Sequence, residues 1–265
     1  MSEFSSIERV ETPNTVRSLA DDMRRLGLQE GMNIIVHSSL SSIGWVCGGA
    51  QAVIKALIDI VTAEGTIVMP AHTGHLSDPA GWGNPPVPEA WWAEIRESMP
   101  AFEAGWTPTY GMGTIAESFR TIPGATRSNH PQTSFAAWGV NADRITSGQS
   151  LHFGMGEQSP LARLYELGAY VLLLGVGYDS NTSFHLAEYR TAGSPRKINF
   201  APVLVDGRRE WKSFDELDFR TDKFDRIGEE FERTSTIVRS GRIGLAPAKL
   251  FPMRDSVDFA VLMLK

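Results

Sequence analysis

A histidine and a glutamate three residues apart form the motif in this sequence that points most directly to chemistry. His185 and Glu188 lie in the segment 175–188, GVGYDSNTSFHLAE, directly after an apolar run at 170–175. On a helix, side chains three residues apart share one face, so the carboxylate can reach the imidazole. Such a carboxylate raises the basicity of the imidazole and fixes its tautomer, as a general base requires. The same spacing also occurs in surface ion pairs, so the spacing alone leaves both interpretations open.

A metal site is a third interpretation of the same pair. His185 and Glu188 would then need further ligands, which His72, His75 and Asp78 could supply. This arrangement would be typical of a metal-dependent hydrolase.

A second motif follows a β-branched run at 34–36. It consists of His37-Ser38-Ser39, then Gly44 and Gly48-Gly49. Small residues let the backbone approach a ligand, and the N–H groups at the start of a following helix attract anions. A pyrophosphate or a pantetheine arm would suit such a turn, although βα turns are also rich in Gly and Ser for packing. The segment matches neither the phosphate-binding loop nor the dinucleotide fingerprint.

A third motif joins TPTYGMG at 107–113 with Arg120 and Arg127. Arginine beside exposed backbone N–H groups suits phosphate oxygens, but a loop with surface arginines fits the pattern equally well. His130 precedes a proline and is therefore expected in an extended conformation, where a structural role is favoured over that of a second base.

Composition excludes several classes of protein. The net charge of -6 argues against a nucleic-acid partner and suits a cationic small molecule. The apolar runs are too short to span a bilayer, and the N-terminal sequence lacks the features of a signal peptide, so we expect a cytoplasmic protein without a membrane partner. The single Cys47 cannot form an internal disulfide, and no Gly-x-Ser-x-Gly elbow is present.

The elements that must position these motifs follow from periodicity. A helix is expected after Asn14 or Thr15 and should end at Gly27, and strands at 34–36 and 66–69 should flank a helix that stops before Gly65. A further helix starting at Ser159-Pro160 should lead into the strand at 170–175, with Asn181 or Thr182 capping the next helix. These units predict an α/β fold with a central mixed, largely parallel sheet flanked by helices.

Two segments depart from this alternation. Residues 71–112 are rich in Gly, Pro and Trp, with one short helix near 89–99, and so long a connection is typical of a lid-like insertion. Residues 200–214 predict an added antiparallel hairpin with a type I′ turn at Asp206-Gly207, followed by an acidic helix near 223–231. We expect a single domain over residues 1–265.

Five segments in fixed order resemble the aminoglycoside 3-N-acetyltransferase family. They are IIVHSSLSSIGWVCGG, GTIVMPAHTGHLSDPAGW, PAFEAGWTPTYGMGTIAESFR, RSNHPQTSFAAWG and LLLGVGYDSNTSFHLAE, within residues 34–190. The family is distinct from the Gly-rich-loop acetyltransferases. The resemblance implies transfer of an acetyl group from acetyl-coenzyme A to the 3-amino group of an aminoglycoside deoxystreptamine ring. It implies direct attack in a ternary complex and an antibiotic-resistance activity, with no metal.

The resemblance also implies roles for individual residues. His185 would be the general base, Glu188 would orient it, and Thr182 would donate to the developing oxyanion. The residues implied on the coenzyme A side are Ser38, Ser39, Gly48, Gly49, Thr109, Met112, Gly113, Arg120, His130 and Ser134. The carboxylates expected on the side of the polycationic acceptor are Asp78, Glu103, Asp179 and Glu229, with Glu230 as an alternative to the last.

One position departs from the family pattern, and three other functions stay open. Tyr110 stands where family members often have arginine, which shifts a donor-phosphate contact to Arg120 or Arg127. The alternatives are an acetyl-coenzyme A-dependent N-acetyltransferase for a different small amine, the metal-dependent hydrolase, and a coenzyme A-binding module without activity. The sequence leaves monomer and homodimer equally possible.

Overall fold

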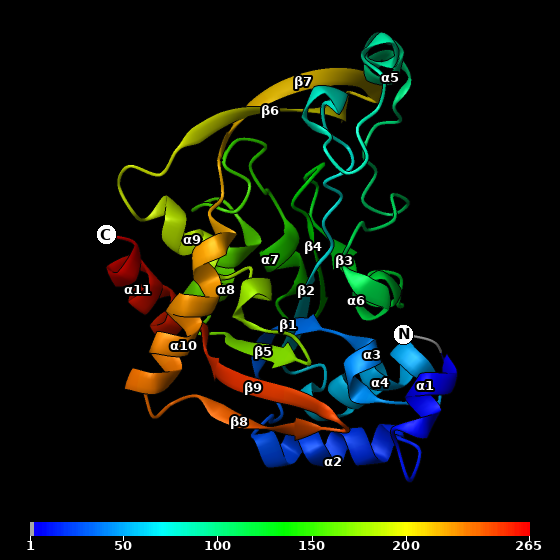
Figure 1. The fold of residues 1–265 in the computed structure, drawn as a ribbon, viewed down its shortest axis with the longest axis vertical. Helices are drawn as coiled ribbons and strands as arrows, with labels where there is room; N and C mark the ends of the chain where they lie inside the picture. Colours follow the sequence, from blue (N-terminus) through cyan, green and yellow to red (C-terminus); the bar gives the residue numbers. More distant parts are fainter. Residues whose placement is uncertain (1–2) are drawn as a thin grey trace.

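A seven-stranded sheet forms the centre of the computed structural model, which describes residues 3–265 (Figure 1). Its strand order is β3-β4-β2-β1-β5-β9-β8. The bounds are β1 (Asn33–Ser38), β2 (Thr66–Pro70), β3 (Thr126–Arg127), β4 (Phe135–Gly139), β5 (Tyr170–Leu174), β8 (Arg239–Ile243) and β9 (Ala246–Pro252).

The sheet is mixed. β1 pairs in parallel with β2 and with β5, and the other four pairings are antiparallel. Two successive antiparallel pairings restore the original direction, so β3 and β8 run with the three central strands, while β4 and β9 run against them. Five of the seven strands therefore share one direction, which confirms the predicted mixed, largely parallel sheet.

Helices cover both faces of the sheet. The first face packs against α2 (Val16–Leu26), α4 (Gly49–Val61) and α6 (Gly113–Phe119). The second packs against α7 (Ala142–Thr146), α8 (Pro160–Glu166), α9 (Phe184–Tyr189), α10 (Phe224–Thr234) and α11 (Met253–Leu264). The short helices α1 (Glu3–Glu8) and α3 (Leu40–Ile43) precede α4. Side chains of β1 alternate between the two layers, with Ile34 and Val36 in the first and Ile35 in the second.

Local sequence signals place several elements correctly. Thr15 caps α2 in a capping box with Ser18, and Gly27 ends that helix in the left-handed conformation, as predicted. Ser159 caps α8 with Pro160 at its first turn. Within residues 3–265, no helix combines the length and the apolar character needed to cross a membrane.

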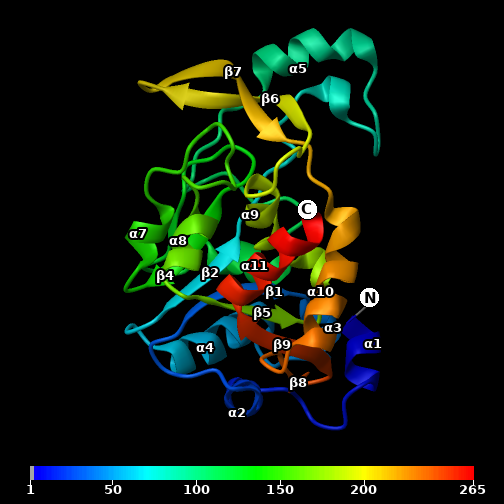
Figure 2. The ribbon, with the colours of Figure 1, turned by 90° about the vertical axis from the view of Figure 1, so that its left-hand side faces the viewer.

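A separate hairpin and an inserted segment lie together above one end of the sheet (Figures 1 and 2). The hairpin consists of β6 (Arg196–Val205) and β7 (Arg208–Leu217), joined by Asp206 and Gly207 with positive φ, as the type I′ prediction requires. The inserted residues 71–112, called the lid segment below, contain the 3-10 turns η1 (Pro79–Gly81) and η2 (Glu89–Trp91) and helix α5 (Trp92–Ser98).

Hydrogen bonds to backbone carbonyls join the hairpin to the lid segment. The Arg209 guanidinium donates to the carbonyl of Met99 at 2.6 Å, and the Phe102 N–H donates to the Pro202 carbonyl at 3.1 Å. An isolated two-stranded hairpin is only marginally stable in water. The hairpin and the lid segment therefore stabilise one another.

Arg127 on β3 ties the lid segment to the sheet. Its guanidinium donates to the carbonyls of Ala71, Ala104 and Thr107 and to the Ser134 hydroxyl, and it lies 4.9 Å from the centre of the Phe102 ring. Burial lowers the pKa of Arg127 to about 10, which still leaves it protonated at neutral pH. Among the described residues, no carboxylate lies within ion-pair distance of this side chain. Its guanidinium is used within the protein, so Arg127 is poorly placed to reach a donor phosphate.

We expect Arg127→Met to destabilise the protein by about 3 kcal/mol, because it removes the guanidinium that donates to the carbonyls of Ala104 and Thr107 and shares the Ala71 carbonyl with Ser134. Urea unfolding measures the change. Arg144→Ala is the matched control, since the Arg144–Glu166 pair is exposed on both sides and spans 3.6 Å, so its loss should cost about 0.5 kcal/mol or less. Equal stability of the two variants would contradict the anchoring role.

Candidate active site

Each of the three central parallel strands brings one histidine to the same edge of the sheet. His37 lies near the end of β1, His72 follows β2 by two residues, and His185 lies on α9 after β5. Ligands of open α/β sheets bind at the carboxyl ends of such strands. All three histidines line one cleft of about 500 Å³.

His185 and Glu188 form a buried pair at this cleft. The Nδ1 atom of His185 lies 2.6 Å from Oε2 of Glu188, and the two residues are 8% and 3% exposed. The backbone N–H of Arg220 donates to the other carboxylate oxygen, Oε1, at 2.7 Å. The ring of Phe219 lies 4.3 Å from that of His185, centre to centre. A buried carboxylate with these partners holds a proton on Nδ1 and leaves Nε2 free to accept one.

The start of α9 differs from the prediction. The helix begins at Phe184 with Ser183 as its N-cap residue, so neither Asn181 nor Thr182 caps it. Asn181 follows the 3-10 turn η3 (Tyr178–Ser180), and its carboxamide oxygen accepts from the N–H and the hydroxyl of Ser183. The 3-10 turn delays the start of the helix, so the residues that the capping pattern had assigned to the cap lie before it. His185 and Glu188 nevertheless share one face of α9.

A second buried carboxylate holds the far end of α9. Glu216 accepts hydrogen bonds from the Tyr189 hydroxyl and from the backbone N–H groups of Leu217 and Gly154, the last two at 2.8 and 3.0 Å. Sequence reasoning missed Glu216, Phe219 and Arg220, because their roles depend on where β7 ends relative to α9. No local pattern in 216–220 reports that position.

The other cleft histidines are neutral near pH 7. Burial, with a smaller contribution from the charge on His185, lowers the pKa of His37 to about 3. Burial and neighbouring cationic groups likewise lower the pKa of His72 to about 3. In residues 3–265, the Nε2 atoms of both histidines are buried and accept or donate no hydrogen bond within the protein.

Four residues predicted on the donor side line the cleft with His185. They are Ser38, Ser39, Met112 and Gly113. Gly113 has a φ of +79°, and a Cβ atom there would lie 3.9 Å from the Ser38 carbonyl oxygen. Because glycine has no side chain, no group projects into the cleft from position 113. Thr182 also lines the cleft and makes no hydrogen bond through its hydroxyl to another described residue.

The other residues predicted on the donor side lie away from the cleft lining. Gly48 and Gly49 start α4, the Thr109 N–H donates to Glu117, and Arg120 pairs with the same carboxylate. His130 and Ser134 are fully buried. The ring nitrogens of His130 bond to the Leu151 carbonyl and to the N–H groups of residues 132 and 133. Contact between these six residues and the donor stays a prediction, and it would require local rearrangement.

The predicted acceptor carboxylates occupy different places. Asp179 lines the cleft beside His185, and its backbone N–H donates to Asp225. Asp78 accepts two hydrogen bonds from Arg96 in the lid segment. Glu103 lines a separate apolar pocket there, between Trp82 and Trp106. Glu229 is exposed on α10, and Glu230 pairs with Arg233.

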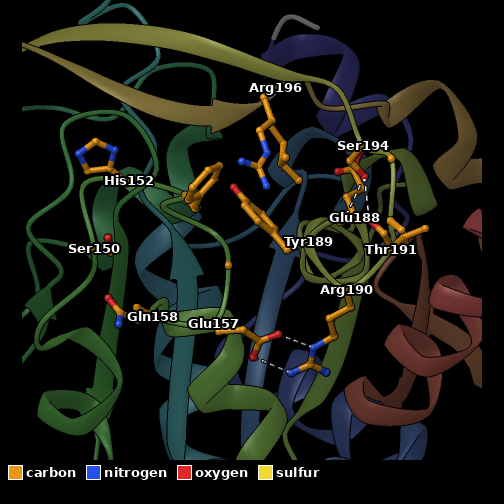
Figure 3. Close-up of a pocket in the computed structure, with 15 residues that line it drawn as sticks. Ser150, His152, Glu157, Gln158, Glu188, Tyr189, Arg190, Thr191, Ser194 and Arg196 are labelled. Atoms are coloured by element: carbon orange, nitrogen blue, oxygen red, sulfur yellow. Dashed lines mark hydrogen bonds and ion pairs between the residues drawn. The ribbon is translucent and has the colours of Figure 1, made fainter.

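A larger depression of about 790 Å³ lies on the Glu188 side of α9 (Figure 3). Tyr189 projects into it, and the Glu157–Arg190 ion pair crosses its lower wall (Figure 3). Glu157 is thus neutralised by Arg190, and His185 does not line this depression. The smaller cleft is therefore the better candidate for the chemistry.

The arrangement of the described side chains does not support a metal site. Over residues 3–265, no set of three or more His, Cys, Asp and Glu side chains is arranged to hold a metal ion. Asp78 is bound to Arg96, and the His75 ring packs on Tyr110 at 4.9 Å. Of the further ligands that the hydrolase alternative requires, only His72 lines the cleft with His185, so the set is not assembled there.

Comparison with known proteins identifies the family to which the chain belongs. The family model described as aminoglycoside 3-N-acetyltransferase matches residues 35–265. The chain belongs to this family. The chain is 34% identical to aminoglycoside N(3)-acetyltransferase VII of Streptomyces paromomycinus, over all of this chain and 96% of that one.

Two solved structures show the same fold over nearly the whole chain. The crystal structure of the YokD protein of Bacillus subtilis is 52% identical, covers 97% of this chain and 96% of its own, and has a TM-score of 0.96. A structure described as AAC-IIIb in binary complex with CoASH is 33% identical, covers 96% and 97%, and has a TM-score of 0.85. The acetyltransferase prediction made from the sequence motifs is thereby confirmed.

We expect Glu188→Gln to lower kcat by a factor on the order of 10² to 10⁴ while the fold survives. An amide can donate to Nδ1, which moves the imidazole proton to Nε2 and blocks the base. Nitrogen NMR of the histidine side chains reports the tautomer directly. Glu157→Gln, in the neighbouring depression, is the control and should keep its activity. An unchanged His185 tautomer together with full activity would contradict the orienting role.

We also expect stability to fall as the pH drops from 6.5 toward 5. His37, His72 and His130 have folded pKa values of about 3, 3 and 4, below the unfolded value of 6.5. Between these values the unfolded chain binds more protons, so acid favours unfolding. The slope from each histidine rises from about 0.7 kcal/mol per pH unit at pH 6.5 toward about 1.4 near pH 5. Urea unfolding at pH 7, 6 and 5 tests this, and a flat profile would contradict the buried neutral state.

Proposed function

We propose that this protein transfers the acetyl group of acetyl-coenzyme A to an amine of an aminoglycoside, at the 3-amino group of the deoxystreptamine ring, with His185 as general base. The observation that carries the proposal is the His185–Glu188 pair, which leaves Nε2 available at a cleft walled by Ser38, Ser39 and Gly113. Family membership supplies the reaction class and the acceptor class. The relative described in complex with CoASH supports coenzyme A as the donor's carrier.

The chemistry follows from the free nitrogen of His185. The acceptor amine attacks the thioester carbonyl carbon, and His185 Nε2 takes the proton that the amine loses. Glu188 stabilises the imidazolium through Nδ1–H. Collapse of the tetrahedral intermediate re-forms the carbonyl and expels the thiolate, which recovers the proton from His185. Donor and acceptor react directly in this scheme, so holding both at the cleft supplies much of the rate enhancement.

The acceptor side of the cleft is acidic at Asp179. A Cβ atom at Gly177 would lie 2.9 Å from a carboxylate oxygen of Asp179 and 3.4 Å from one of Asp225, so the two carboxylates lie close to the same glycine. Two carboxylates facing one small residue attract a polycation such as an aminoglycoside. The Asp179 prediction thereby becomes the strongest of the acceptor-side proposals.

The donor side follows the wall formed by β1 and the start of α6. Ser38 and Ser39 line the cleft together with Met112 and Gly113, and Gly113 lies close to the Ser38 carbonyl oxygen. We place the pantetheine arm along this wall, because its amide groups can bond to the serine hydroxyls and its narrow chain fits beside glycine.

Release of free coenzyme A thiol from acetyl-coenzyme A, with a panel of aminoglycosides as acceptors, tests the proposal. Acceptor-dependent release is expected, and His185→Ala should lower kcat by about 10²- to 10⁴-fold while coenzyme A still binds. His152→Ala, which removes an exposed histidine outside the cleft, is the control and should stay active.

Two other outcomes would change the assignment. Full activity of His185→Ala would contradict the general base. Coenzyme A binding with no release for any aminoglycoside would favour a different small amine as acceptor. Release restored by simple amines would then establish that alternative.

A further inference from the structure

Two imidazoles on the second face of the sheet converge on the proposed reaction site. Side chains alternate along β1, so His37 points to the same face as Ile35, the face that α9 covers. His185 reaches the cleft from α9 itself, and both rings line it.

The Nε2 atom of His37 is a buried polar group with no partner in the part of the chain that the structure describes. His37 is 6% exposed. Buried polar atoms are almost always hydrogen bonded, so an orphan at a cleft calls for an explanation, and a partner on a bound ligand is one. A strand end also fixes the ring more firmly than a loop would. Sequence position strengthens the argument, since His37 directly precedes Ser38 and Ser39 on the proposed donor wall.

We propose that His37 is a second catalytic imidazole, whose Nε2–H donates a hydrogen bond to the thioester carbonyl oxygen of bound acetyl-coenzyme A and to the oxyanion that forms from it. The inference rests on the proposed function and adds a group to it. As the amine attacks, the carbonyl π electrons move to oxygen, and His37 stabilises that charge while keeping its own proton. When the carbonyl re-forms, the carbon–sulfur bond breaks and the thiolate leaves with its electron pair. His185 alone carries the transferred proton.

Neutrality suits His37 for this role. Burial keeps its pKa far below neutral pH, so the ring enters the reaction uncharged. A neutral imidazole polarises a carbonyl without surrendering its proton. The Thr182 hydroxyl also lines the cleft and can act beside it.

Two substitutions separate the donor from the ring. His37→Gln keeps an N–H near the Nε2 position, whereas His37→Phe keeps the ring and removes the N–H. We expect kcat to fall by a factor on the order of 10² in the Phe variant and by less in the Gln variant, with little change in KM for the donor. His152→Phe is the matched control, because it replaces a histidine outside the cleft.

Infrared spectroscopy of bound donor gives a readout that packing alone would not move. With acetyl-coenzyme A labelled with carbon-13 at the thioester carbonyl, we expect the wild-type protein to lower the carbonyl stretching frequency relative to free donor. The frequency should return toward the free value in His37→Phe, with His37→Gln between them. Binding of coenzyme A and thermal unfolding are measured on each variant. If the Phe variant fails to fold, the Gln variant and the wild-type spectrum still decide.

The outcomes distinguish this inference from the proposed function. Acceptor-dependent thiol release with the same carbonyl frequency in wild type and His37→Phe would overturn the role of His37 alone. An unshifted wild-type band on bound donor would overturn it as well. Absence of acetyl-coenzyme A binding or of any transfer in the wild type would overturn the proposed function, and the role of His37 with it.

Discussion

The hydrogen bond between His185 and Glu188 sets the constraint on which the rest of the site depends. A carboxylate that is 3% exposed must be satisfied within the protein, because leaving it unpaired in the interior is costly. One of its oxygens is bound to the imidazole and the other accepts the Arg220 N–H. Neither oxygen can change partner without losing a buried interaction. The imidazole is therefore held in one orientation by groups from two distant parts of the chain.

The sheet explains why this pair meets the other cleft residues. β2, β1 and β5 are parallel neighbours, so the residues following each strand gather at one edge. Their connections are helices on opposite faces, which leaves that edge open to ligands. β4 and β9, which run antiparallel to the three central strands, extend the sheet on either side of them. The candidate cleft thus lies where three chain segments come together because their strands are parallel neighbours.

Sequence reasoning reached the central strands, the caps of α2 and α8, and the hairpin turn, because local rules govern each of them. The helical spacing of His185 and Glu188 likewise predicted their contact. β4, β8, β9 and α11 escaped prediction, since short strands such as Phe135–Gly139 acquire their identity only from their neighbours. The same limit applies to Arg127, whose loop position suggested a phosphate ligand. Its actual partners are carbonyls from residues 71, 104 and 107, which no local pattern brings together.

The path of β7 connects the lid segment physically to the His185–Glu188 pair. One end of the strand holds Arg209, which donates to the carbonyls of Arg96 in α5 and of Met99 directly after it. The other end leads through Glu216 to Phe219 and Arg220, which contact α9 and its histidine. One continuous strand therefore joins the lid segment to the groups around Glu188. By thermodynamic reciprocity, a molecule that binds the lid segment more tightly when His185 is correctly oriented also favours that orientation. Where that difference in affinity exists, ligand binding at the lid segment and the orientation of His185 are coupled through β7.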